Sequence, residues 1–264
     1  MVRLYFHYVA AQLRSQLQYR GSFLLQLLGT VFMAGVELLG VWSLLNRFGS
    51  IDGWKLEEVA ILYGLVFTGF GVAEIVGRGF DLFSSHIRTG TFDLILLRPR
   101  TTFLQVAGDK FAFNRLGRMF LGVTVLIWGL STTAILWNLF NVLLLIATVT
   151  AVIVLFIAIF IATAAVMFWT VQSLELFAIV TNGSVDAGTY PVTIYRRFMR
   201  RFLLFFIPIG TVTYFPVTVL LDRPDPLGVA PWLGWIAPLA GPLFMLVALL
   251  LWRLGVRHYS STGS

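Results

Sequence analysis

Cysteine is absent from this chain of 264 residues, which excludes disulfides, thiolate catalysis and cysteine-based metal sites. No Gly-Lys dipeptide occurs either, so the chain lacks the Gly-x-x-x-x-Gly-Lys-Ser/Thr loop that cradles nucleotide phosphates. Acidic residues are few, 12 against 19 basic ones, and the formal net charge is +7. These absences remove the commonest sequence signals of a soluble enzyme.

The three histidines, His7, His86 and His258, are far apart in the sequence, which gives little support to a metal site or a Ser-His-Asp arrangement. Asp222 and Asp225 could form an acid pair. Prolines surround them, however, and a solvated turn is the better interpretation. A membrane-embedded enzyme would need acids, bases or metal ligands clustered at one depth, and the chain does not offer them.

Long apolar runs dominate what is present, because 58% of the residues are apolar. Each run can cross roughly 30 Å of hydrocarbon at about 1.5 Å per helical residue. We therefore expect an all-α integral membrane protein with six transmembrane helices in a single domain, residues 1–264. The six runs are 22–45, 59–76, 116–136, 142–168, 202–221 and 232–251.

The segments that join these runs alternate between many basic residues and few. If the N-terminus is cytoplasmic, the outer segments carry only Arg47, Lys55 and Arg223. This imbalance satisfies the positive-inside rule and predicts a multi-pass protein of the cell inner (plasma) membrane with both termini cytoplasmic. Lipid headgroups explain the charge better than nucleic acid does. The inner segments hold Arg3, Arg14, Arg20, Arg78, Arg88, Arg98, Arg100, Lys110, Arg115, Arg118, Arg196, Arg197, Arg200, Arg201, Arg253 and Arg257.

Residues 1–20 have the length of a helix but are too polar to span. Arg3, His7 and Arg14 fall within about 40° of one another on a helical wheel, which favours an amphipathic helix in the headgroup plane. A leader that only fixes orientation by its charge is the alternative.

The long inner connection at 78–110 is the most informative polar stretch. Phe80, Phe83 and Ile87 recur at helical spacing, with Asp81 and Arg88 among the polar residues around them. Such a short helix, with apolar side chains and charged flanks, could receive motion from a soluble partner. A helix that touches only lipid fits the same pattern. Gly90 permits a tight helix stop, and Pro99 blocks continuation of whatever helical piece covers Asp93 to Leu97.

The run Ile87-Arg88-Thr89-Gly90-Thr91-Phe92-Asp93-Leu94-Ile95-Leu96-Leu97-Arg98-Pro99 resembles the "IRxGxxDxxLLRP" signature of ABC-2-type ABC transporter permeases, in particular the small six-helix bacterial branch. The proline and aromatic pattern at 190–195, 206–208 and 214–216 is similar to that branch as well. The resemblance extends over essentially the whole chain in helix number, loop lengths and orientation.

The resemblance implies the membrane-spanning half of an exporter, in which two six-helix subunits, alike or similar, each rest on an ATPase subunit. Residues 79–88 would form the coupling helix that contacts the ATPase, and Gly90, Asp93, Arg98 and Pro99 would shape the next turn. ATP and Mg would be bound by the two partner ATPase subunits and no cofactor by this chain, which would not itself be an enzyme. Export, rather than import, follows from the resemblance alone.

Two acidic residues lie within the apolar runs, where a charged carboxylate costs at least about a few kcal/mol. Glu37 is near the middle of the first run and has no arginine close to it in that run. A role in the translocation path or at a subunit interface is one interpretation of it. Glu74 is near the inner end of the second run, one helical turn from Arg78. Pairing with Arg78 is the favoured interpretation there, with a place in the path as the alternative.

Smaller features add local expectations. Ala147, Ala151, Ala158 and Ala162 are spaced for close helix approach, either inside the bundle or across a subunit seam, and the first is favoured. The stretch 181–184, Thr-Asn-Gly-Ser, is expected to break any helix. The basic cluster at 196–201 suits anionic headgroups.

An ATP-driven permease agrees with all of these features. A secondary transporter or channel-like protein without an ATPase partner is the alternative, although a secondary transporter is expected to show matching internal repeats with interrupted helices, which we do not find.

Overall fold

A computed structural model describes residues 2–170 and 174–260 of the chain, and every statement below concerns this part. It is helical throughout, apart from a single two-residue bridge between Ile51 and Trp54. The N-terminal half contains α1 (Val2–Gln18), α2 (Arg20–Phe48), α3 (Leu56–Val76), α4 (Arg78–Asp81), α5 (Phe83–Arg88), α6 (Phe92–Leu96), α7 (Thr102–Ala107), η1 (Phe113–Arg115) and α8 (Leu116–Thr132).

The C-terminal half begins with the long helix α9 and ends with α14, and short helices follow one another between them. Its elements are α9 (Leu139–Val166), α10 (Leu174–Gly188), η2 (Val192–Ile194), α11 (Arg197–Arg201), the π-helical turn η3 (Phe202–Phe206), α12 (Ile209–Leu220), α13 (Pro231–Ile236), η4 (Ala237–Leu239) and α14 (Ala240–His258).

The centre of the molecule is α3, which is buried along nearly its whole length between α8 and α9. It is apolar all round, as expected of a helix that has neighbours on every side. Glycines allow the closest of these contacts: a Cβ on Gly64 of α3 would lie 2.5 Å from the Leu126 backbone of α8, and one on Gly122 of α8 would lie 2.5 Å from the Thr68 nitrogen of α3. Because both clashes are with backbone atoms, neither helix can carry a side chain there at this separation.

The small residues of α9 pack inside the molecule, as favoured from the sequence. Ala151 and Ala158 are buried. A Cβ on Gly241 of α14 would lie 2.5 Å from the Ala151 carbonyl oxygen, so α9 and α14 approach one another at small residues. Ala147 is exposed and takes no part in this contact.

Four segments are long and apolar enough to cross a membrane, and they coincide with four of the predicted runs: α2, α3, α9 and the combined segment Pro231–His258. The third predicted run forms α8, whose 17 residues lie at the short end of the range of about 17 to 25 that can span a bilayer. The protein is thus an all-helical, multi-pass membrane protein with four or five candidate spans.

The fifth predicted run, 202–221, is a bent pair of helical segments, so whether it forms a span remains a prediction. The segments Arg197–Phe206 and Ile209–Leu220 meet at 93°. Pro208 lies in the break and cannot donate a backbone hydrogen bond to a continuing helix, while the Thr211 hydroxyl donates to the Leu204 carbonyl oxygen at 2.7 Å. The chain therefore turns sharply before α12.

A correction concerns the stretch 181–184, which was expected to break a helix and instead lies within α10. The Ser184 hydroxyl donates to the Val180 carbonyl oxygen at 2.6 Å, so this polar side chain has a hydrogen-bond partner within the helix. A Cβ on Gly183 would meet nothing within 4 Å, so this glycine lies on an open helix face.

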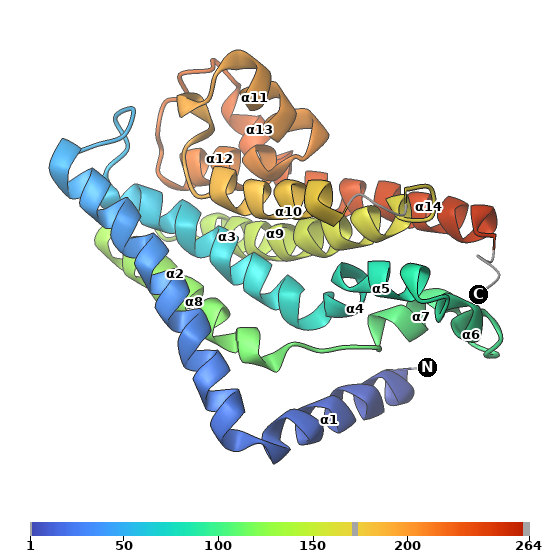
Figure 1. Cartoon of the computed structure of the whole chain (residues 1–264). Coiled ribbons are helices and arrows are strands. Elements are labelled where there is room, and N and C mark those ends of the chain that lie inside the picture. Colours follow the sequence, from blue (N-terminus) through green and yellow to red (C-terminus); the bar gives the residue numbers. More distant parts are fainter. Residues whose placement is uncertain (1, 171–173, 261–264) are drawn as a thin grey trace.

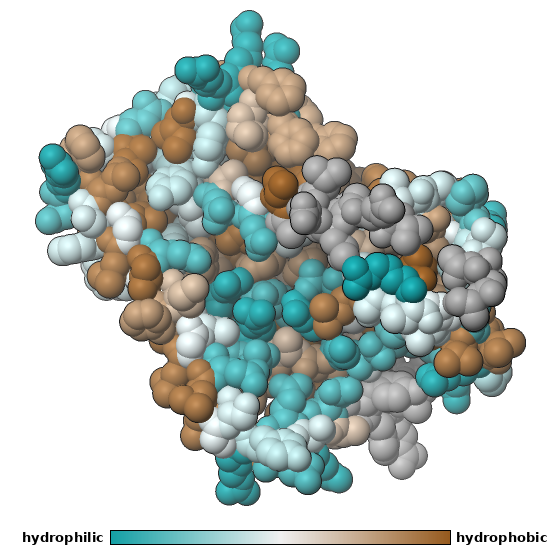
Figure 2. Space-filling view, in the orientation of Figure 1, coloured by the Kyte–Doolittle hydropathy of each residue, from teal (hydrophilic) through white to brown (hydrophobic). Residues whose placement is uncertain are grey.

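The elements divide between two ends of the molecule (Figure 1). The loop after α2 lies at one end, while α4 to α7 and both chain termini lie towards the other. At the first end, Arg223 pairs with Glu58 at 2.8 Å and donates to the Gly53 carbonyl oxygen at 2.9 Å, which ties together two of the connections predicted to be outside. Apolar surface follows the edge formed by α2, and hydrophilic residues gather across the middle of the same face (Figure 2).

Candidate functional site

The segment between α3 and α8 folds back on itself as four short helices, and two glycines permit this path. A Cβ on Gly79 of α4 would lie 1.8 Å from the Val106 carbonyl oxygen of α7, so only glycine fits where these helices touch. Gly90 follows the end of α5 with φ +67°, a left-handed conformation that favours glycine. The helix stop predicted at Gly90 is therefore present.

The three apolar side chains of this segment, Phe80, Phe83 and Ile87, are buried. The Phe83 ring centroid lies 5.1 Å from that of Phe168, just after α9, and 5.0 Å from that of Trp252 on α14. Edge-to-face and tilted aromatic contacts at such distances add about 0.5 to 1.5 kcal/mol each beyond burial. These side chains therefore point inward and join α5 to the ends of α9 and α14.

Asp93 connects the next helix to the same end of α14. Its carboxylate oxygen Oδ1 accepts a hydrogen bond from the Tyr259 hydroxyl at 3.0 Å, and the neighbouring Phe92 ring packs edge-on against the Tyr259 ring at 4.9 Å. Burial and the bond to Asp93 raise the pKa of Tyr259. The tyrosine is therefore a neutral hydrogen-bond donor at physiological pH, and α6 is tied to α14 rather than being free.

His86 and Asp109 join α5 to the chain just after α7. His86 Nε2 lies 3.2 Å from Asp109 Oδ2, and His86 Nδ1 lies 2.9 Å from the Thr91 hydroxyl oxygen. The hydrogen bond from His86 lowers the pKa of Asp109, so its carboxylate is ionised at neutral pH. The α5 to α7 region is consequently held together by polar contacts at its edge as well as by the aromatic cluster within.

What this region leaves exposed differs from what the helical spacing indicated. Leu94, Leu96 and Leu97 are 58%, 44% and 81% exposed, and Arg88, Arg98, Pro99 and Arg100 beside them in the sequence are exposed too. We name the exposed residues of 94–100, which exclude the buried Ile95, together with Arg88, the 94–100 surface. Exposed leucines flanked by arginines are typical of a surface that binds another protein. Sequence reasoning placed Arg88, Arg98 and Pro99 in the site but missed the leucines, although three apolar residues next to a proline were visible.

Glu74 is neutralised by partners other than the one predicted. Its carboxylate is 6% exposed and lies 2.9 Å from Arg118 Nη1 and 3.5 Å from Arg115 Nε. Arg118 also lies over the Phe70 ring, 5.1 Å from its centroid. The predicted pairing with Arg78 is wrong, because Arg78 forms its ion pair with Asp81 instead. Pairing itself was the right expectation for a carboxylate in this place.

Burial raises the pKa of Asp81 above its ordinary value, although the neighbouring guanidinium of Arg78 opposes this effect. The two residues are one turn apart at the junction of α3 and α4. Together with Glu74, Arg115 and Arg118 they form a chain of charges that joins α3, α4, η1 and α8 at this end of the bundle.

Glu37 lies near the middle of α2, and its side chain is exposed. Within the described part of the chain it forms no hydrogen bond or ion pair. It is still not isolated, since the positive charge of Arg118 on α8 and the negative charge of Asp186 on α10 both act on it. One turn earlier, the Tyr63 hydroxyl of α3 donates to the Ala34 carbonyl oxygen at 2.9 Å and fixes α2 beside α3.

These carboxylates do not assemble into a metal site. Among the described residues, no group of three or more His, Asp or Glu side chains could hold a metal ion. The arrangement instead consists of a packed junction at one end, formed by α4 to α7, and an exposed carboxylate halfway along α2. Catalytic chemistry needs convergent reactive groups, which neither place provides.

No curated protein matches the chain. The family model described as ABC-2 family transporter protein matches residues 31–263, which include α2 from residue 31 onward, the other candidate spans and the whole junction between α3 and α8. The signature at 87–99, the multi-pass helical architecture and this match over most of the chain agree. The chain is a membrane-spanning transport subunit without catalytic function, and it belongs to the ABC-2 family of transporter proteins.

Proposed function

We propose that this chain is the permease subunit of an ATP-driven exporter, moved by a separate ATPase subunit that binds the 94–100 surface. The observation that carries the proposal is the junction of α4 to α7. Its outer side presents exposed leucines and arginines, and its inner side packs on Phe168 and Trp252 at the ends of α9 and α14. A push on the exposed side would therefore reach two long helices through packed side chains.

In this proposal the coupling residues act in two layers. Arg88, Arg98 and Pro99 belong to the contact surface, while Phe80, Phe83, Ile87 and Asp93 transmit its movement inward, and Asp81 and Gly90 shape the turns between them. The family supports ATPase partners. Two such subunits, each with ATP and Mg, and a second permease copy or a similar permease complete the proposed complex, with no nucleic acid involved.

The proposed topology has six crossings. Besides α2, α3, α9 and Pro231–His258, we assign one crossing to α8 and one to the broken path that includes α12. Both termini contact the α3 to α8 junction, through Gln12 to the Asp109 carbonyl oxygen at 3.1 Å and through Tyr259 to Asp93. This arrangement supports placing both on the same, cytoplasmic, side.

The contact with the ATPase is tested by cross-linking. Because the chain has no cysteine, a single introduced cysteine is its only reactive thiol. A Leu97→Cys variant, produced together with its proposed ABC ATPase partner, should cross-link to that subunit with a short thiol-to-amine reagent. Leu136→Cys, equally exposed at the other end of the molecule, is the matched control and should give no such product. If position 97 gives no cross-link, or if no ATPase co-purifies with the chain, the alternative of a transporter or channel that works alone would be favoured.

Glu37 is the proposed path residue, because it is an exposed carboxylate at mid-helix, whereas Glu74 is saturated by two arginines and is assigned a structural role. Charge reversal by Glu37→Lys should lower export of cationic compounds relative to neutral ones, and Glu37→Gln should have a smaller effect in the same direction. Competitive uptake of a panel of dyes into inverted vesicles measures this preference. An unaltered preference in both variants would remove Glu37 from the path.

A further inference from the structure

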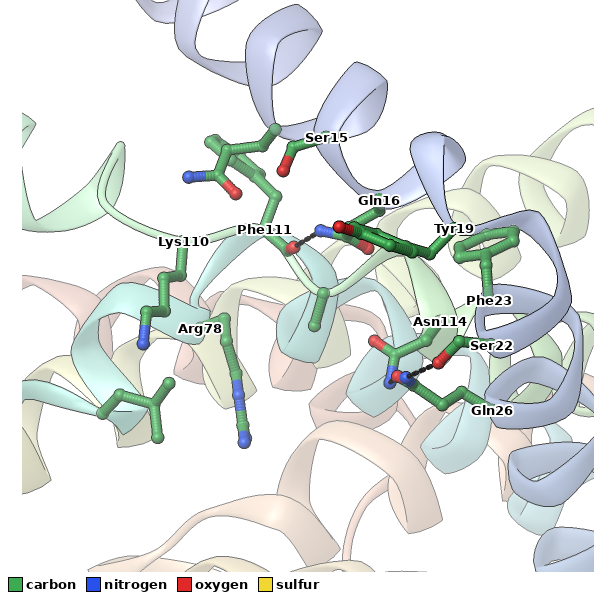
Figure 3. Close-up of a pocket in the computed structure, with 13 residues that line it drawn as sticks. Ser15, Gln16, Tyr19, Ser22, Phe23, Gln26, Arg78, Lys110, Phe111 and Asn114 are labelled. Carbon is green, nitrogen blue, oxygen red and sulfur yellow. Dashed lines mark hydrogen bonds between the residues drawn. The ribbon is translucent and has the colours of Figure 1, made fainter.

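A polar cavity lies between the N-terminal helix and the junction described above. It has a volume of about 530 Å³ and is enclosed by the end of α1, the beginning of α2, Arg78 and Leu82, and the segment that precedes α8. Figure 3 shows Arg78 and Lys110 on one side of it, with Ser22, Gln26 and Asn114 on the other. None of the contacts that couple α5 to α9 and α14 involves this cavity.

The charges that line the cavity are of one sign. Among the described residues, Arg78 and Lys110 are its only ionisable side chains apart from the Tyr19 phenol, and no acidic residue lines it. Arg78 is partly offset by its ion pair with Asp81, whereas Lys110 is exposed and forms no ion pair within the described residues. Amides and hydroxyls supply further hydrogen-bond donors, including those of Asn114, Gln26 and Ser22. Cations together with neutral donors are the groups that bind phosphate oxygens.

Side-chain hydrogen bonds join the elements around the cavity. Gln12 and Gln16 of α1 donate to the carbonyl oxygens of Asp109 and Phe111, and Asn114 donates to the Gln26 side chain at 3.1 Å. The same residues that enclose the space therefore fix α1 against the segment before α8. A bound anion would meet donors that are already in place, which lowers the entropic cost of binding.

Apolar surface adjoins the polar lining. Phe23 at the start of α2 and Leu82 line the cavity itself. Leu24, Leu25 and Leu28 on the next turns of α2 are 56%, 72% and 60% exposed. Because α2 is a candidate span and α1 ends where it begins, the cavity lies where a membrane-crossing helix leaves the hydrocarbon. A ligand with a phosphate group at one end and acyl chains at the other fits both the polar lining and the adjoining apolar surface.

We propose that this cavity binds the phosphate headgroup of an anionic phospholipid, whose acyl chains lie along the exposed leucines of α2. The bound lipid bridges α1 and α2 to Arg78 and Lys110 on either side of the α3 to α8 junction. It thereby fixes α1 at the membrane surface. This proposal does not depend on how the ATPase contacts the chain.

Photo-cross-linking in lipid nanodiscs tests the site directly. The full chain is embedded in phosphatidylcholine with a small fraction of phosphatidylglycerol that carries a diazirine near its headgroup, and the adducts are mapped to peptides. We expect adducts within 12–26 and 110–114 at low probe fractions. In Lys110→Gln the probe fraction needed for half-maximal adduct at these peptides should rise about tenfold, the effect of losing one charged hydrogen bond.

Matched controls separate this site from general attraction to a basic protein. Arg253→Gln removes an exposed arginine from a different cavity, of about 460 Å³, at the end of α14, and should leave adducts at 12–26 and 110–114 unchanged. A phosphatidylcholine probe should label these peptides at least about fivefold less, because charge contributes to binding.

Four results would overturn the proposal. They are equal labelling of wild type and Lys110→Gln, an equal loss in Arg253→Gln, equal labelling by the phosphatidylcholine probe, and full suppression of the adducts by millimolar inorganic phosphate. The last would assign the cavity to a soluble phosphate compound. Unchanged thermal unfolding of Lys110→Gln verifies that a loss of adducts does not come from misfolding.

Discussion

Glu74 is a carboxylate surrounded by apolar helices, and two guanidinium groups make this position tolerable. Arg118 reaches it from α8 at 2.9 Å and Arg115 reaches it from η1 at 3.5 Å. The sequence predicted that Glu74 would be paired, because an unpaired charge in hydrocarbon is costly. It could not identify the partners, since they are more than 40 residues away and only the packing of α3 against α8 brings them close.

The pairing of Glu74 leads to a prediction at this scale. Arg118→Met should lower the free energy of unfolding by about 3 to 5 kcal/mol, because it leaves a buried carboxylate with one weaker partner. The double variant Arg118→Met with Glu74→Gln should recover a large part of this loss, since the uncompensated charge is gone. Unfolding in detergent, followed by circular dichroism, measures both. A double variant no more stable than Arg118→Met would show that the pair does not carry the effect.

Among the elements, the long apolar helices could be predicted from the sequence and the interrupted ones could not. The runs at 22–45, 59–76, 142–168 and 232–251 coincide with candidate spans, because length and hydropathy decide whether a helix can cross a bilayer. The 93° break before α12 depends on Pro208 and on the Thr211 side chain, and α10 continues through Gly183 because Ser184 bonds within its own helix. Local hydrogen bonds of this kind have no periodic signal.

The same limit applies to the region between α3 and α8. The spacing of Phe80, Phe83 and Ile87 predicted one short helix, whereas Phe80 lies on α4 and Phe83 and Ile87 lie on the separate helix α5, although all three are buried. The spacing carried no information on what covers these side chains, and the aromatic residues that do so, Phe168 and Trp252, come from the far half of the chain.

The close contact of α3 and α8 at glycine leads to a prediction about stability. Gly122→Ala would place a Cβ 2.5 Å from the Thr68 backbone nitrogen, so α3 and α8 must separate, at a cost of about 1 to 3 kcal/mol. Gly183→Ala is the matched control, because a Cβ there meets nothing within 4 Å and alanine favours a helix by about 0.5 to 1 kcal/mol. Thermal unfolding in one detergent compares them. Equal midpoints for the two variants would contradict the packing of α3 on α8.

Over the whole molecule, the proposed function uses two ends that are separated by the helical bundle. At one end, Arg223 forms an ion pair with Glu58 and a hydrogen bond to Gly53. The other end carries the junction of α4 to α7, which residues near both termini contact (Figure 1). The distribution of basic residues predicts which side each end faces, because 16 of 19 fall on segments assigned to the cytoplasm, and this assignment of sides stays a prediction. The membrane-spanning bundle between the ends is the part that a motor would have to move.

The most direct test of this account is the side of the membrane on which the 94–100 surface lies. Leu97→Cys and Leu136→Cys, each the single cysteine of the chain, are treated with a membrane-impermeant maleimide in intact cells and in inverted vesicles. The account predicts that position 97 reacts only in inverted vesicles and position 136 only in intact cells. Labelling of position 97 from outside intact cells would contradict it, because no cytoplasmic ATPase could then reach this surface.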